Sequence, residues 1–256
     1  MNALPQPKTH QLVDRINALR AVSPRFIDPA EITPLSREWR AIGQDIRQLL
    51  HVDARAAWEL TGSWRALAGD VEGAEGAFRN AVALGLSDVG RENWMITRLS
   101  LGMFSAAQAL YRELCGMRTR NLAVIAQYGF LAGAVRRTAE LIGEARMRGV
   151  EWDEGWAESV LLASRIMTEV GVSDEEIAHR LDCAGVVLRR HGLWPSINVR
   201  VSFVEAVHRC LMYTLSLPLT WEQTQEKLEG ELLLEEGKLS YFCTAALGIA
   251  FDGRTA

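Results

Sequence analysis

The sequence predicts a mainly α-helical protein of the α+β class: a short α-solenoid followed by a small α-β-β-α-β domain with a mainly antiparallel sheet. Two patterns support this fold class. Through most of the chain, apolar residues recur every three or four positions in short blocks separated by glycines, which is typical of amphipathic helices joined by tight turns. Near the C-terminus apolar residues recur at every second position instead, which favours half-buried strands.

The composition is that of an ordinary globular protein. The 256 residues are 48% hydrophobic and 23% charged, and a net charge of -4 gives no global attraction to nucleic acid or to an anionic membrane. Four widely spaced cysteines and the absence of a signal-peptide pattern in residues 1–10 predict reduced thiols in a cytoplasmic protein. The longest uncharged stretch, 121–135, is too short to span a bilayer, so we expect no membrane insertion.

Residues 1–52 predict two helices separated by a proline-rich connection. Apolar spacing favours a first helix from His10 to Val22, which Pro24 ends. After the prolines, Ser36 can cap a second helix.

From residue 53 to 150 the chain alternates helices and short breaks. The expected helices span 53–68, 70–84, 88–101, 105–117, 119–131 and 133–148. The breaks between them contain Gly69, Gly85, Gly102, Gly116 and Gly133. Breaks this short predict antiparallel neighbours, that is, a series of αα-hairpins.

The first of these hairpins carries the residues of a known repeat. Around the turn at Gly69 the chain places, at fixed spacing, Trp58, Gly62, Ala74, Phe78 and Ala81. This pattern resembles the tetratricopeptide repeat, in which small residues let two helices cross closely and large residues fill the space beside them.

Two later segments repeat parts of this pattern. The second contains Gly102, Ala107, Tyr111 and Leu114, although Met95 stands where a small residue is usual. The third contains Ala126, Gly133, Thr138, Ile142 and Ala145. Ala74, Ala107 and Thr138 follow one another at intervals of 33 and 31 residues, against a family period of about 34. A plain helical bundle with small residues at its helix crossings is the alternative.

The resemblance implies a protein-binding function, because the first helices of stacked hairpins line a concave groove. Carried over by position, the groove residues are Glu59, Ser63, Glu92, Asn93, Ile96, Arg120 and Gln127. Their mixture of charged and amide side chains suits a peptide or a helix of another protein, including one within a multi-protein complex. We therefore expect a non-catalytic adaptor, chaperone or regulatory subunit of bacterial type, with no cofactor.

Residues 151–256 predict the small α+β domain. Its expected elements are helices at 153–170 and 173–191, strands at 197–203 and 207–217 joined through 205–206, a helix at 220–236, and one or two last strands over 239–251. The second helix begins with Ser173 and Glu176 at the spacing of a capping box.

The segment 173–191 allows two interpretations. It is similar to a helix-turn-helix, with Arg189 and Arg190 near phosphates, although Asp182 stands where the turn prefers glycine. Its apolar residues also fit one unbroken amphipathic helix. The first interpretation gives the alternative function, a DNA-binding regulator.

Catalytic patterns are missing from the sequence. It contains no phosphate-binding loop, dinucleotide fingerprint, zinc-protease motif or nucleophile elbow, and its five histidines are scattered. His208 and Cys210 share one face of a strand, but a solvated or subunit-covered surface is the simpler explanation. The glutamates of the helix at 220–236 suggest a solvated face or a dock for a basic partner. We expect no catalytic residue and no metal site, and an enzyme without a familiar motif is the second alternative.

Overall fold

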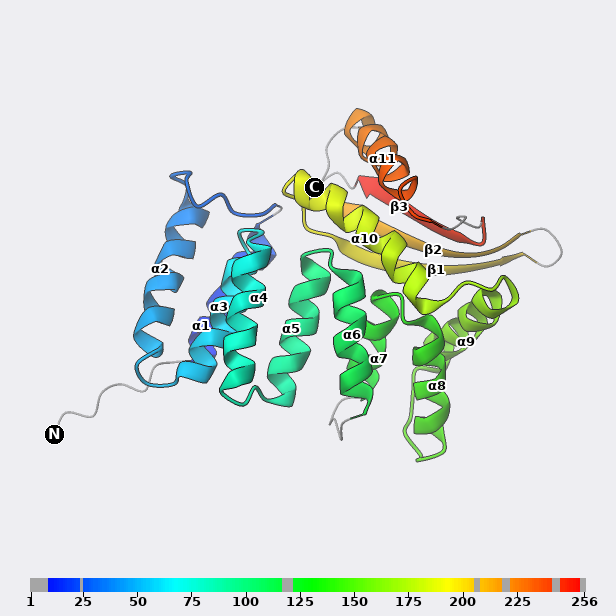
Figure 1. Ribbon diagram of the computed structural model, residues 1–256, viewed down its shortest axis with the longest axis horizontal. Helices are drawn as coiled ribbons and strands as arrows, with labels where there is room; N and C mark the ends of the chain where they lie inside the picture. The colour runs from blue at the N-terminus through cyan, green and yellow to red at the C-terminus, as the bar shows by residue number, and fades with distance from the viewer. Residues whose placement is uncertain are drawn as a thin grey trace. The chain divides into compact units, whose positions relative to one another are not determined.

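The computed structural model describes residues 9–23, 25–116, 122–204, 208–217, 222–240 and 245–253 (Figure 1). It divides into two compact units, residues 1–97 and 98–256. Within the described residues the chain forms eleven helices and one three-stranded sheet, so the predicted α+β, mainly α class is confirmed.

The first unit consists of antiparallel helices joined by short turns. Its helices are α1 (Thr9–Val22), α2 (Pro34–Leu49), α3 (Ala54–Ala66), α4 (Val71–Ala83) and α5 (Asp88–Ser100). The boundary between the units falls within α5. The helices predicted over 53–68, 70–84 and 88–101 are therefore confirmed to within two residues at each end.

The start of α2 differs from the prediction. Its N-cap is Thr33 rather than Ser36: Thr33 Oγ1 accepts a hydrogen bond from the Ser36 N–H (3.1 Å), and Ser36 Oγ accepts one from the Thr33 N–H (3.0 Å). Pro34 occupies the first helical position, where a missing N–H leaves no helical bond unmade. Ser36 therefore belongs to this capping box as the partner of the cap.

Small residues allow α2, α3 and α4 to approach one another closely. A Cβ atom at Gly62 on α3 would overlap the ring of Phe78 on α4, and one at Gly43 on α2 would overlap the ring of Trp64 on α3. Trp64 stacks on Trp39 with ring centroids 4.1 Å apart, and each indole N–H donates to the other residue's carbonyl oxygen (2.7 and 3.0 Å). The close helix crossing that the sequence predicts at Gly62 is present.

The second unit combines helices with the sheet. After α5 its elements are α6 (Phe104–Cys115), α7 (Leu122–Leu131), α8 (Val135–Arg146), α9 (Glu154–Glu169), α10 (Asp174–Arg190), β1 (Ser196–Val204), β2 (His208–Leu217), α11 (Glu222–Glu236) and β3 (Leu247–Gly253). The last strand begins later than predicted, because Leu239 lies in a bend after α11. Residues 241–244, and the predicted hairpin turn at 205–206, lie outside the described residues.

The sheet is mixed rather than mainly antiparallel. Its strand order is β1-β2-β3, with β1 and β2 antiparallel and β2 and β3 parallel. A parallel pair needs a long crossover connection, usually a helix, and α11 is that connection. The helix predicted over 220–236 therefore already favours a parallel last strand over an antiparallel one.

One face of β2 is buried against helices. Leu211, Tyr213 and Leu215 alternate along the strand and are fully buried. The Tyr213 hydroxyl donates to the carbonyl oxygen of Phe130, at the end of α7 (2.8 Å), and burial raises the pKa of this hydroxyl well above its ordinary value. Helix α9 also packs on β2, so this strand contacts both α7 and α9 in addition to its neighbouring strands.

The predicted domain boundaries at residues 52 and 150 differ from the two units. Residue 150 lies inside the second unit, where α8 and α9 pack together and α10 packs on α6. Residue 52 lies inside the first unit, where α2 packs on α3. The change in sequence pattern after residue 150 therefore does not coincide with a change in packing.

The first turn of α6 is capped by a residue of a distant helix. The residue before α6 is Met103, whose side chain makes no capping hydrogen bond. Instead the Asp182 carboxylate, on α10, accepts hydrogen bonds from the backbone N–H groups of Phe104 (2.6 Å) and Ser105 (3.2 Å). A carboxylate at this place satisfies unpaired amides and complements the positive end of the helix dipole.

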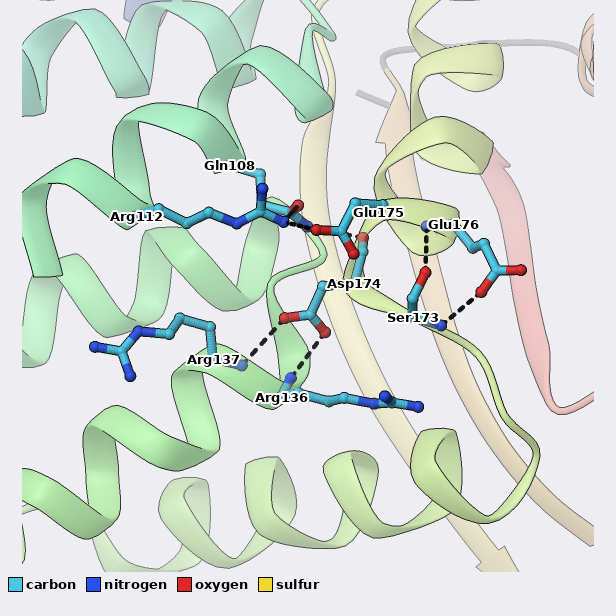
Figure 2. Close-up of polar contacts among 8 residues, drawn as sticks. All are labelled: Gln108, Arg112, Arg136, Arg137, Ser173, Asp174, Glu175 and Glu176. Carbon is cyan, nitrogen blue, oxygen red and sulfur yellow. Dashed lines mark hydrogen bonds and ion pairs between the residues drawn. The ribbon is translucent and has the colours of Figure 1, made fainter.

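The same arrangement recurs at α8. The residue before this helix is Ala134, which cannot cap it. The Asp174 carboxylate accepts hydrogen bonds from the backbone N–H groups of Arg136 (2.9 Å) and Arg137 (3.1 Å), as Figure 2 shows. Asp174 and Asp182 are two helical turns apart, so they lie on one face of α10.

Glycines let α10 lie directly against the two turns. Gly102 and Gly133 precede α6 and α8, and both have positive φ angles (64° and 84°). A Cβ atom at Gly185 on α10 would overlap the carbonyl oxygen of Gly102. Arg189 donates to the carbonyl oxygens of Leu101 (2.6 Å) and Gly102 (2.9 Å). Helix α10 thus binds both the amide groups and the carbonyl groups around the first of these turns.

Replacement of Asp174 tests the capping of α8. Asp174→Ala should lower the free energy of unfolding by about 1–2 kcal/mol, because two amides lose their acceptor. Burial raises the pKa of the Asp174 carboxyl despite its bonds to two backbone amides. Stability from this group is therefore lost as the pH rises through the raised folded-state pKa. Asp174→Asn keeps one of the two acceptor oxygens and removes the charge, so it should lose less stability than Asp174→Ala at pH 7.

Urea unfolding followed by circular dichroism measures both variants, with Glu158→Ala, an exposed change on α9, as the control. Equal losses in Asp174→Ala and Asp174→Asn would show that the acceptor oxygen is unimportant and would contradict the capping role.

Candidate functional site

Five of the predicted groove residues come together in the first unit. Glu59 and Ser63 lie on α3, and Glu92, Asn93 and Ile96 lie on α5. All five side chains are half-buried, so each has one side in contact with the protein and one side accessible. The Asn93 amide donates to Glu59 Oε1 at 2.7 Å and joins the two helices. We call this set of residues the α3–α5 surface.

Gly90 on α5 leaves room for the end of the Glu59 side chain from α3. A Cβ atom at Gly90 would lie 2.8 Å from Glu59 Oε2 and would overlap the side chain of Leu86. One helical turn after Gly90, Trp94 stacks on Phe78 of α4 with ring centroids 5.5 Å apart. The position of Asn93 opposite Glu59 is therefore accompanied by packing of α5 on α4.

The charged side chains that define the α3–α5 surface are the two carboxylates of Glu59 and Glu92. Burial raises the pKa of Glu92, and the nearby carboxylate of Asp88 on the same helix raises it further. Among the residues that the structure describes, no lysine, arginine or histidine forms an ion pair with Glu59 or Glu92. Glu59 and Glu92 thus offer negative charge and hydrogen-bond acceptors that no cation of the described residues pairs with.

The other two predicted groove residues are placed differently. Gln127 lies on α7, in the second unit, where its side chain is exposed. Arg120 lies outside the described residues.

The sequence patterns did not single out Gly90 or Asp88 as parts of this surface. A glycine inside a helix costs about 1 kcal/mol in helix propensity. A glycine at such a position therefore indicates that another group lies close to the helix backbone there.

The helix-turn-helix interpretation of 173–191 is wrong. These residues form the single helix α10, capped as predicted by Ser173 and Glu176 (Figure 2). Asp182 does not mark a turn, since its carboxylate caps α6. The Arg189 guanidinium is half-buried on backbone carbonyls, and Arg190 pairs with two glutamates. Both arginines that would contact phosphates are thus engaged within the protein.

Three of the six glutamates of α11 contact basic side chains of α10 or of the residue after it. Glu231 and Glu235 form ion pairs with Arg190, Glu236 forms one with Arg180, and Glu231 also shares a hydrogen bond with His191. The sequence suggested that the glutamates of this helix form a solvated face or a dock for a basic partner. Neither description fits Glu231, Glu235 and Glu236, because these three side chains bind residues of the same chain.

Several other features bear on chemistry. The Cys210 side chain is buried, and the side chain of His208 lies outside the described part of the chain. The described residues contain no cluster of three or more histidine, cysteine, aspartate or glutamate side chains that could hold a metal ion. In the same residues, none of the helices has the length and apolar character needed to cross a membrane. No protein-family model, curated protein or solved structure matches this chain.

The contacts between α10 and α11 predict that replacing Arg180 and replacing Arg190, both on α10, will lower the free energy of unfolding by different amounts. The Arg180–Glu236 pair (2.9 Å) is nearly buried, with side-chain exposures of 8% and 11%, and Arg180 also donates to the Leu247 carbonyl oxygen. Arg180→Ala should lower the free energy of unfolding by about 3–5 kcal/mol, because Glu236 keeps its buried charge and loses its partner.

Arg190→Ala is the matched comparison. The Arg190 side chain is 50% exposed, so water replaces the lost contacts and the loss should be much smaller. Urea unfolding of both variants measures the difference. Comparable losses would contradict the assignment of Arg180 as the buried link between α10, α11 and β3.

Proposed function

We propose that this chain is a non-catalytic protein-binding module, an adaptor or regulatory subunit, which holds a segment of another protein on the α3–α5 surface. The observation that carries the proposal is the bond between Asn93 and Glu59, which joins two neighbouring helices. Around this bond the accessible sides of Ser63, Glu92 and Ile96 offer further contacts.

The sequence resemblance to tetratricopeptide repeats supports this proposal. In such repeats the first helix of one hairpin lies beside the first helix of the next, and together they line the binding groove. Here α3 and α5 begin successive hairpins, and the α3–α4 crossing at Gly62 and Phe78 has the closeness that the repeat requires. Ala74 and Ala81 on α4 are buried, as small residues at such a crossing would be.

The chemistry of the α3–α5 surface favours a partner segment that supplies donors and positive charge. Two carboxylates and one amide are present, and the carboxylates have no cationic partner among the described residues. A lysine or arginine of the partner would be attracted here, whereas an acidic segment would be repelled. Because such modules act inside multi-protein complexes and the chain has no paired cysteine spacing, we place the protein in the cytoplasm.

Selection from a random peptide library displayed on phage, with the full chain as bait, tests this function. The affinities of selected peptides are then measured for the double variant Glu59→Gln/Glu92→Gln, which removes both charges and keeps the size of the side chains and one acceptor oxygen on each. We expect binding to weaken at least about tenfold, because the negative charges that attract a partner cation are lost.

The matched control is Asp14→Asn/Glu72→Gln. It changes the net charge of the first unit equally at two exposed positions on α1 and α4. Selected peptides that bind the wild type and both double variants equally would refute the α3–α5 surface as the binding site, and a library that yields no binder would refute recognition of linear segments.

A further inference from the structure

Exposed apolar side chains gather at one end of the first unit. Figure 1 shows that the turn between α2 and α3 and the turn between α4 and α5 lie at the same end. Side chains in or beside these turns are exposed: Leu50 (37%), Val52 (64%), Val82 (38%), Leu84 (50%) and Val89 (62%). The Arg55 guanidinium, at the start of α3, reaches the Gly85 carbonyl oxygen of the second turn (3.5 Å). We call the five exposed apolar residues Leu50, Val52, Val82, Leu84 and Val89 the turn patch.

The turn patch continues the α3–α5 surface. Val89 lies one helical turn before Glu92 and Asn93 on α5, and residues three or four apart on a helix lie on the same face. Leu84 lies in the turn that leads into α5. A segment bound along α5 could therefore contact Glu92 and Val89 together.

The fold gives no reason for these apolar residues. Val89 stands in the first turn of α5, where a β-branched residue lowers helix propensity, and its side chain is mostly outside the core. A polar residue there would favour the helix and solubility alike. Gathered apolar side chains on a surface are characteristic of sites where another molecule binds.

The charges beside the turn patch limit what that molecule can be. Asp88 and Glu92 lie one turn apart on α5, and burial together with the Asp88 carboxylate raises the pKa of Glu92. A second copy of this chain, docked symmetrically on the same patch, would place these carboxylates near their own equivalents and be repelled. A segment with a positive charge would be attracted.

We infer that the partner segment carries a lysine or arginine next to a large apolar side chain, with the cation between Glu59 and Glu92 and the apolar side chain on Leu84 and Val89. This inference rests on the proposed function and specifies the partner's chemistry. The cation matches the two carboxylates, which form no ion pair within the described part of the chain, and the apolar side chain covers exposed surface that water otherwise contacts.

The peptide selection tests this inference with a second pair of variants. Leu84→Ser/Val89→Ser removes the apolar contacts of the turn patch, and Val22→Ser/Ile32→Ser makes equivalent changes at two more exposed positions of the same unit, 65% and 77%. Unchanged circular dichroism and melting temperature verify that each variant is folded. Selected peptides should share a basic residue beside a large apolar one, and they should bind Leu84→Ser/Val89→Ser at least about tenfold more weakly while binding the control normally.

The outcomes separate this inference from the proposed function. Peptides weakened by Glu59→Gln/Glu92→Gln and unaffected by Leu84→Ser/Val89→Ser would overturn the inference and leave the proposed function standing. Peptides weakened by neither pair would overturn both. Selected peptides without a basic residue would overturn the role of the cation. Dimerisation of the wild type in sedimentation experiments, lost in Leu84→Ser/Val89→Ser, would assign the patch to a second copy and also overturn the inference.

Discussion

Helices α6 and α8 begin after residues that cannot cap them, and α10 supplies the missing acceptors. Asp182 and Asp174 stand two turns apart on one helix, and each binds the first amides of a different hairpin helix. By contrast α4 has its own cap in Asp70, which accepts a hydrogen bond from the Gly73 N–H. Methionine and alanine stand at the N-cap positions of α6 and α8. The first amides of these two helices therefore depend for their acceptors on α10, which follows them in the chain.

This dependence explains why the second unit combines hairpins and sheet. The face of α10 that carries the two aspartates binds the turns before α6 and α8, while Arg180 binds Glu236 of α11 and the backbone of β3. Asp174, Arg180 and Asp182 of α10 are thus bound within the unit, as are three glutamates of α11. In the first unit, by contrast, Glu59 and Glu92 are accessible carboxylates with no cation bound to them among the described residues.

The helices could be predicted from the sequence because their signals are local. Glycines in the breaks, the Ser173–Glu176 capping box and the apolar spacing all act within a few residues. The caps that α10 provides could not be predicted from the sequence. Asp182 and Phe104 are 78 residues apart, and nothing near either residue indicates that they pair. The parallel pairing of β3 was missed although the intervening helix favours it. Of the α3–α5 surface, repeat spacing located Glu59 and Asn93, whereas the hydrogen bond between them depends on the close approach at Gly90.

Binding of a protein segment on α3 and α5 would change how fast the backbone amides of these helices exchange with solvent. Hydrogen–deuterium exchange of the full chain, with and without a peptide selected for binding, reports directly which backbone amides become protected. Protection should increase in α3 and α5, where Glu59 and Asn93 join the helices, and change little in α10 and β2. Protection confined to α10, α11 or the sheet would place the binding site elsewhere and refute binding on α3 and α5.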